Sequence, residues 1–424
     1  LYDAAVRCGD HLCATFGPPP QRTWRNGHPG LEYALCRLGR LVNEVQGAGQ
    51  GDKYIRLARH FLDHQHEGGN PSEYNQSDKP AVELSEAKGH AVRATYFYTA
   101  MTDIALHQDD AAYRQAVARI WSNAIDKKHY LTGGVGASHH GEAFGGDYEL
   151  PNDAYCESCA GCGLTFWADR MHRLHADGHY RDVQERTLYN NILGAVELTG
   201  TNFYYQNPLD ANNARYPWHG CPCCVGNIPR ALLAIKDGIY SVNPARTELY
   251  LSHYVDSEGT LANIAGVTLG LRQETEYPWK GDVKIEAVKY SEASSAAKAR
   301  ENAAKVTIEV ATEGNIVRIE TKYPKGGGLF GGDSVDVSVD YKLTIPQTAG
   351  LKAKNISGDI DVAGLGGPAD LDAVSGDITL RTASQGAQCN SVSGDVTVTG
   401  ITGAVFVKSV SGDVKATQVK GSVE

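Results

Sequence analysis

The chain has 424 residues, of which 42% are hydrophobic and 21% are charged, so it is long enough for two or three globular domains with cores of their own. Its net charge of −10 argues against a nucleic-acid partner, which would need clustered Lys and Arg side chains. No run of about 18 apolar residues is present, which excludes a membrane-spanning helix.

Residues 1–17 show the pattern of an amphipathic helix and lack the charged and apolar regions of a signal peptide. Because the chain starts with Leu1 rather than Met, a leader could have been lost before it. The ten cysteines, most without an evident partner, favour a reducing compartment such as the cytoplasm. The location otherwise stays open.

Most of the first 235 residues show the apolar spacing of helices. After the first helix, the pattern predicts others over residues 31–45, 54–64, 86–106, 111–125, 157–174 and 180–193. Short connections rich in Gly, Pro and Asp separate them. Serial helices in this number are typical of a bundle, a helical toroid or a solenoid.

From about residue 239 the pattern becomes that of strands, first over residues 239–251 and 268–278. The next segment, 284–305, contains a run rich in Ala, Lys and Glu and predicts a linker. Beyond it, residues 306–324 alternate around Glu313-Gly314-Asn315, which predicts a β-hairpin, and residues 335–346 predict another strand.

A repeat occupies the C-terminal region. The triplet Ser-Gly-Asp, followed by Ile or Val, begins at Ser357, Ser375, Ser393 and Ser411, at a constant spacing of 18 residues. The spacing predicts a β-solenoid with one rung every 18 residues and a turn at each triplet, where Gly supplies the turn dihedral and the Asp side chain bonds to nearby backbone. A calcium array is the alternative, but one carboxylate per rung is few for a cation that takes six to eight oxygens.

Six of the ten cysteines fall into two tight groups, Cys156-Cys159-Cys162 and Cys221-Cys223-Cys224. Thiolates gathered beside an acidic residue are a donor set that zinc selects. On a helix that starts near Tyr155, spacing alone brings Cys156 and Cys159 to one face and proposes a four-thiolate site with Cys223 and Cys224. The competing interpretation is that these are buried apolar cysteines in packed helices.

A second group of polar residues lies in the Gly-rich loop 133–144, where His139 and His140 precede Glu142. One carboxylate beside imidazoles could act as a general acid, although the same pattern fits a solvated loop. The loop is not followed by Gly-Lys-Ser/Thr, so it does not fit a phosphate loop. His90 lies on a predicted helix, where a single His is more often a core residue than a catalyst.

Six segments occur in one order along the chain and carry a family resemblance: GHAVRATYFYTAMTDIA, GGVGASHHGEAFGGDYELPND, AYCESCAGCGLTFWADRM, ERTLYNNIL, NFYYQNPL and HGCPCCVGNIPR. Together they closely resemble the zinc-dependent β-L-arabinofuranosidases of glycoside hydrolase family 127, over roughly residues 1–280. The resemblance implies an (α/α)6 barrel that carries the active site, followed by β-sandwich domains. Residues 281–424 resemble adhesin-type domains of unknown function with Ser-Gly-Asp repeats, which implies a β-solenoid.

The resemblance also implies roles for individual residues. The Zn²⁺ ligands would be Glu157, Cys159, Cys223 and Cys224, so Glu157 replaces Cys156 of the spacing argument. Cys223 would be the nucleophile of a retaining hydrolysis, and Glu142 the general acid and base. Residues matched to positions around the sugar or the metal are His28, His90, Glu185, Tyr205 and His219.

The chain departs from the family pattern at both ends of the similar region. The stretch that precedes the equivalent of Leu1 in the family is absent, and the β-sandwich is cut short near Trp279. We count about eight helices where a closed barrel needs twelve. The expected architecture is α then β: a partial (α/α)6 barrel over 1–237, a truncated β-sandwich over 238–283, the linker, and hairpins with a β-solenoid over 306–424. Either a second chain completes this open barrel, which makes a homo-oligomer an option, or the chain is a fragment or fusion with impaired activity.

The leading hypothesis is a retaining glycosidase that releases L-arabinose from terminal β-L-arabinofuranosides of a glycan or glycopeptide. Its rival is a non-catalytic protein in which zinc is a structural clamp and the solenoid a scaffold or surface-binding element. A third hypothesis is a redox sensor that uses Cys223-Cys224.

Overall fold

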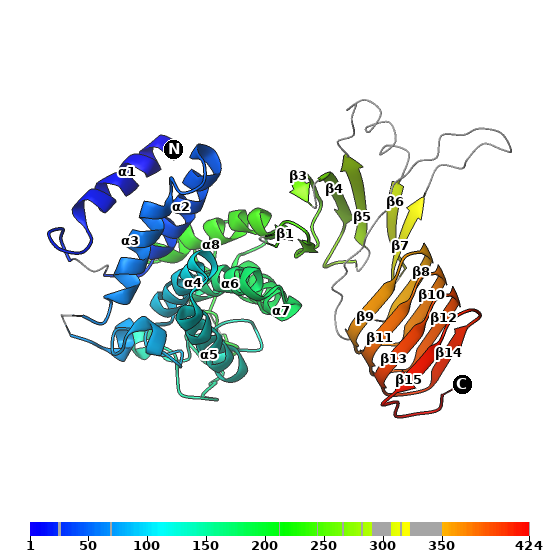
Figure 1. Ribbon diagram of the computed structural model, residues 1–424. Coiled ribbons are helices and arrows are strands. Elements are labelled where there is room, and N and C mark those ends of the chain that lie inside the picture. The colour runs from blue at the N-terminus through cyan, green and yellow to red at the C-terminus, as the bar shows by residue number, and fades with distance from the viewer. Residues whose placement is uncertain are drawn as a thin grey trace. The chain divides into compact units, whose positions relative to one another are not determined.

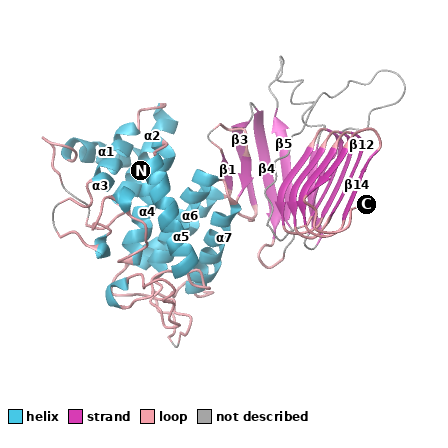
Figure 2. Ribbon diagram, turned by 60° about the horizontal axis from the view of Figure 1, so that its bottom comes forward, coloured by secondary structure: helices cyan, strands magenta, loops and turns pink. Residues whose placement is uncertain are grey.

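The computed structural model describes residues 1–23, 27–67, 70–211, 213–243, 245–264, 267–280, 283–290, 307–313, 316–322 and 350–423. The chain divides into two compact units, Leu1–Gly238 and Ile239–Glu424. The first is helical and the second is built from strands (Figures 1 and 2). The predicted fold class, a helical domain followed by short sheets and a β-solenoid, is therefore confirmed.

The described part of the first unit contains eight α-helices, in agreement with the expected number. They are α1 Tyr2–Thr15, α2 Leu31–Gln46, α3 Asp52–Asp63, α4 Ala91–Gln108, α5 Ala111–Lys128, α6 Ser158–His175, α7 Gly178–Arg186 and α8 Cys223–Ala234. Single helical turns occur at η1 Glu73–Asn75, η2 Ala81–Glu83, η3 His140–Glu142 and η5 Ile235–Gly238, and η4 Thr187–Leu193 is a π-helix. Among the described helices, none combines the length and the apolar character needed to cross a bilayer.

One helix begins later than expected, and one helix is additional to those expected. The helix predicted over 86–106 begins at Ala91, because the ring of His90 caps it by accepting a hydrogen bond from the backbone N–H of Arg93. Helix α8 was not among the predicted helices. Its sequence contains Gly226 and Pro229, which are unfavourable inside a helix and so weaken the helical signal.

Helices α4 and α6 lie side by side at the centre of the helical unit (Figure 1), and every residue of 91–105 and of 158–172 is buried. Small residues at the start of α6 allow this close approach, since a Cβ atom at Gly163 would lie 2.1 Å from Oγ1 of Thr95. Further along, Trp167 packs against Tyr98 and Trp121 with ring centroids 5.1 and 4.8 Å apart. The packing fixes the N-terminus of α6, from which two of the predicted metal ligands project.

The second unit begins with two sheets. Strands β1 Tyr240–Val242 and β2 Leu249–Leu251 pair with each other. A five-stranded antiparallel sheet follows in the order of the chain, formed by β3 Ser257–Ile264, β4 Val267–Thr275, β5 Val283–Tyr290, β6 Thr307–Glu313 and β7 Ile316–Lys322. The predicted hairpin around Glu313 is confirmed by the pairing of β6 with β7.

The linker predicted over 284–305 is wrong in its first part, because β5 continues to Tyr290 and Ile285 pairs with Val310 of β6. Apolar and charged residues alternate in VKIEAVKY, which is the signal for a strand and not for a linker. One sheet thus joins the segment assigned to a truncated β-sandwich with the segment assigned to hairpins. Residues 291–306, and the strand predicted over 335–346, lie outside the described residues.

The C-terminal repeat forms two parallel four-stranded sheets (Figure 1). Residues 18 apart lie in register, as in the pairing of Leu371 with both Ala353 and Cys389. Side chains that point between the sheets are buried, among them Leu371, Leu380 and Val398. The strands are β8 Leu351–Ser357, β9 Ile360–Leu365, β10 Ala369–Ser375, β11 Ile378–Ala383, β12 Ala387–Ser393, β13 Val396–Ile401, β14 Val405–Ser409 and β15 Val414–Thr417.

Each Ser-Gly-Asp triplet connects a strand of one sheet to a strand of the other. An Oδ1 atom of Asp359 accepts the backbone N–H of Asp377 at 2.9 Å, and the same bond links Asp377 to Asp395 and Asp395 to Asp413 at 2.8 Å. In each of these three carboxylates, one oxygen therefore accepts a hydrogen bond from the next rung. This arrangement agrees with the structural role expected for Asp and weakens the calcium alternative.

The glycine of the triplet is expected to be essential for stacking the rungs. A Cβ atom at Gly394 would lie 2.1 Å from the carbonyl oxygen of Gly376 in the preceding rung. Gly394→Ala should therefore separate the rungs and destabilise the solenoid by about 2 kcal/mol or more, seen as faster hydrogen exchange of the rung amides. The neighbouring Ser393→Ala is the matched control, and equal exchange in the two variants would contradict the prediction.

Candidate metal centre and active site

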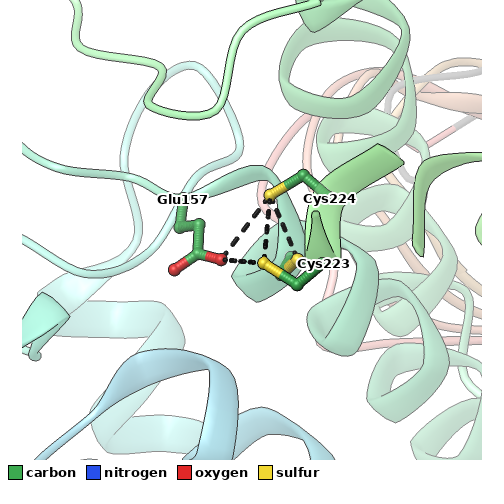
Figure 3. A group of neighbouring side chains, drawn as sticks. Glu157, Cys223 and Cys224 are labelled. Atoms are coloured by element: carbon green, nitrogen blue, oxygen red, sulfur yellow. Dashed lines mark hydrogen bonds between the residues drawn. The ribbon is translucent and has the colours of Figure 1, made fainter. Parts of the chain in front are cut away.

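Four of the predicted site residues come together at the N-termini of two helices. Glu157 is the residue that precedes α6 and Cys159 lies in its first turn, whereas Cys223 and Cys224 are the first two residues of α8. Figure 3 shows Glu157, Cys223 and Cys224 converging from the two helices. One donor atom from each of the four residues lies within 4.8 Å of the others, so the group could hold a metal ion.

The structure decides between Cys156 and Glu157 as a member of this group. Cys156 has a left-handed backbone (φ 40°) and is buried with Tyr130, Ala137 and Ala154, where burial raises the pKa of its thiol to about 12. Glu157, at the non-helical position before α6, directs its carboxylate toward the cysteines. Helical spacing placed Cys156 in the site because it assumed a helix that begins one turn earlier.

Three of the distances within the group suit a tetrahedral ion. Oε1 of Glu157 lies 3.4 Å from Sγ of Cys223 and 3.5 Å from Sγ of Cys224, and the two sulfur atoms are 3.9 Å apart. Zinc bonds of about 2.3 Å to sulfur and 2.0–2.2 Å to oxygen set these separations at about 3.5 Å and 3.8 Å. The Cys159–Cys224 sulfur pair, at 3.1 Å, is closer than that.

A second observation supports the fit. Glu157 is 3% exposed, and its Oε2 atom is buried without a hydrogen-bond partner. A buried carboxylate oxygen without a partner is costly, and a cation would remove the cost. Three sulfur atoms and one carboxylate form a donor set of the kind that zinc prefers.

Electrostatics single out Cys223 among the three cysteines. Hydrogen bonds from Cys159 and Cys224 hold the pKa of Cys223 well below its usual range, whereas burial and hydrogen bonds with Cys159 and Cys223 raise the pKa of Cys224. Burial, and then the charge of Cys223, raise the pKa of Glu157 to about 8. Cys223 is only half-buried while Cys159 and Cys224 are fully buried, so the thiol with the lowered pKa is also the most accessible of the three.

Glu142 is held by two donors from neighbouring segments. Tyr155 donates its hydroxyl to Oε1 at 2.6 Å, and Nε2 of His90 lies 3.0 Å from Oε2. Because Nδ1 of His90 accepts the N–H of Arg93, the proton of the neutral ring lies on Nε2 and points to the carboxylate. Burial lowers the pKa of His90, which agrees with a neutral ring. Glu142 is thus a carboxylate held in one orientation, which favours the general-acid interpretation over that of a solvated loop residue.

Three other predicted residues lie around these two groups. Tyr205 lies 3.1 Å from Sγ of Cys223 through its hydroxyl, and its ring stacks on that of His219 at 3.9 Å. The backbone of Tyr205 is tied to the start of α6, since its carbonyl accepts the N–H of Ser158. His28 packs edge to face against His90 with centroids 5.9 Å apart.

Glu185 differs from these residues. It lies on α7, partly exposed, and its charge acts with burial to raise the pKa of Tyr189. The contacts described above do not include it, so its assignment to the sugar site rests on the resemblance alone.

Sequence reasoning missed three neighbours of the site. Tyr155 precedes the cysteine motif and bonds Glu142, Cys221 places its sulfur 3.6 Å from that of Cys223, and Asn227 contacts Cys159. Cys221 was noted only as part of a group. Asn227 could have been found only if α8 had been predicted, because it lies one turn after the cysteines on that helix.

Comparison with known families matches two parts of the chain. Residues 1–237 match the family described as "Beta-L-arabinofuranosidase, GH127 catalytic domain". Residues 265–422 match the family described as "Toastrack DUF4097". The two matches correspond to the helical unit and to most of the strand-rich unit.

Individual relatives agree with the first match. The chain is 29% identical over 322 residues to a "Non-reducing end beta-L-arabinofuranosidase" of Bifidobacterium longum subsp. longum, which covers 66% of this chain and 47% of that protein. It is 39% identical to a solved GH127 β-arabinofuranosidase, with a TM-score of 0.61 and coverage of 68% and 44%. A solved GH127 β-L-arabinofuranosidase from Geobacillus stearothermophilus T6 is 33% identical, with a TM-score of 0.62, and the match covers 68% of this chain and 49% of that one. The chain spans about half the length of these relatives.

Proposed function

The chain belongs to the GH127 β-L-arabinofuranosidase family through residues 1–237, and from this membership we propose that its helical unit is a retaining glycosidase that releases L-arabinose from terminal β-L-arabinofuranosides. The observation that carries the proposal is the convergence of Glu157, Cys159, Cys223 and Cys224, with the most accessible sulfur on Cys223. The named activity of the relatives supports the same substrate class.

In this proposal Cys223 is the nucleophile. Its sulfur attacks the anomeric carbon, a C–S bond forms, and the bond to the leaving oxygen breaks. Glu142 donates a proton to that oxygen, then removes a proton from the water that cleaves the C–S bond. Two inversions at the anomeric carbon give retention. Tyr155 and His90 hold the carboxylate of Glu142 in one orientation for both steps.

The proposed metal is zinc, held by Glu157, Cys159, Cys223 and Cys224. When bound, it would keep the thiolates deprotonated at neutral pH and fix their positions. Tyr205, His219, His28 and Glu185 are proposed to bind the hydroxyls of a furanose, because phenol, imidazole and carboxylate groups offer both donors and acceptors. An arabinofuranoside-containing glycan or glycopeptide would supply the substrate.

Metal analysis combined with an activity assay tests this function. We expect the purified chain to contain about one zinc per molecule and to release L-arabinose from an aryl β-L-arabinofuranoside. A chelator should abolish release, and added zinc should restore it. Bound zinc without turnover would instead support the rival in which the metal is a structural clamp.

A further inference from the structure

We propose that Asn227 is a positioning residue of the metal centre, which holds the thiolate of Cys159 through its side-chain amide and is itself oriented by Arg230. The inference rests on the proposed zinc site and adds two residues to it. Nδ2 of Asn227 donates to Sγ of Cys159 at 3.1 Å, and a guanidinium N–H of Arg230 donates to Oδ1 of Asn227.

The geometry of α8 explains why one helix serves both purposes. Asn227 follows Cys223 by four residues and Cys224 by three, so its side chain lies on the same face of the helix as the two ligands. Cys159, the sulfur donor from α6, is the one that Asn227 reaches. Helix α8 thus supplies two ligands directly and one hydrogen bond to a third that comes from another helix.

Arg230 fixes which end of the amide points at the sulfur. An arginine side chain has donors and no acceptor, so the amide atom that it contacts must be the oxygen. The amino group of Asn227 is then left to face Cys159. With the amide turned over, an oxygen lone pair would face a thiolate and repel it.

Charge makes this donor necessary. Three thiolates and one carboxylate carry a charge of −4, and a divalent ion reduces it to −2 in a site where Glu157, Cys159 and Cys224 are buried. Buried negative charge is tolerated when hydrogen bonds reach it. Cys223 is half-buried and has the hydroxyl of Tyr205, whereas Cys159 is fully buried and has the amide of Asn227.

Zinc affinity of the full chain, measured by competition with a chromophoric chelator, tests the role without reference to turnover. Asn227→Ala is expected to weaken zinc binding by about 10- to 100-fold. Asn227→Asp is the sharper variant, because it keeps the shape and the contact with Arg230 while it replaces the donor by a carboxylate. We expect it to lose at least as much affinity as Asn227→Ala. Arg230→Met should lose less, because only the orientation of the amide is released.

Matched controls are Asn190→Ala and Arg186→Met, which remove an amide and a guanidinium from exposed positions outside α8. The charge-transfer absorption of the cobalt-substituted protein shows whether all three thiolates still coordinate. Zinc affinity of Asn227→Asp within twofold of that of the unaltered chain would overturn the inference, as it would show that only the shape of the side chain matters. If the unaltered chain itself fails to bind zinc, the proposed function fails first, and the two failures are thereby distinguished.

Discussion

Cys223→Ser is expected to lower kcat/KM for an aryl β-L-arabinofuranoside by about 10⁴-fold or more, which is the scale seen when a covalent nucleophile is removed. The reason is that a serine hydroxyl in the place of Cys223 remains protonated near neutral pH, whereas this sulfur receives hydrogen bonds that favour its charged form. Initial rates with the zinc-saturated enzyme measure the effect.

Loss of a metal ligand could mimic loss of the nucleophile, so the design needs a partner variant. Cys224→Ser removes the neighbouring ligand, which is fully buried and less suited to attack. At saturating zinc it should retain more activity than Cys223→Ser. Cys8→Ser, on the exposed face of α1, is the control for thiol removal as such. Activity of Cys223→Ser above one tenth of the original, a threshold of about 1.4 kcal/mol, would exclude Cys223 as the nucleophile.

Glu142→Gln is expected to reduce kcat by about 10²- to 10⁴-fold for a substrate with a poor leaving group, because proton donation to the leaving oxygen is lost. The amide keeps the shape of the side chain and can still accept from Tyr155. With a dinitrophenyl leaving group, which needs no proton, the first step should be spared and the arabinosyl adduct on Cys223 should accumulate. Mass spectrometry of the quenched protein would detect it.

The control for this variant is Glu149→Gln, which changes another carboxylate in the same stretch of loop, one that accepts the backbone N–H of Gly146. Equal losses with both leaving groups would show that Glu142 does not act as the acid. Added azide should restore turnover only in Glu142→Gln, since this small anion can replace the water that Glu142 would activate.

Much of the fold could be predicted because its signals are local. The amphipathic spacing of residues 31–45 and 111–125 and the 18-residue spacing of Ser-Gly-Asp each depend on neighbours in the chain, and the structure follows them. Predictions failed where two local signals competed. Gly226 and Pro229 weaken the helical signal of α8, so that helix was not predicted. The linker composition after Tyr290 led to a predicted linker that wrongly included β5.

The candidate site could be predicted only in part. Glu157 and Cys223 are 66 residues apart, and no periodicity relates positions on two different helices, so the resemblance to a family was needed to pair them. Local reasoning chose Cys156, because it could not foresee the left-handed backbone that turns this residue away. Tyr155 and Asn227 depend on contacts that form only after the helices pack.

The aspartate bonds between rungs have a further consequence. In each rung the backbone N–H of the Asp donates to the Asp carboxylate of the preceding rung, and its own carboxylate accepts the same bond from the next rung. Such a unit is interchangeable, so whole blocks of 18 residues could be inserted or removed without disturbing the joints that remain. Each added or removed block would therefore change the length of the solenoid by one strand spacing, about 4.8 Å.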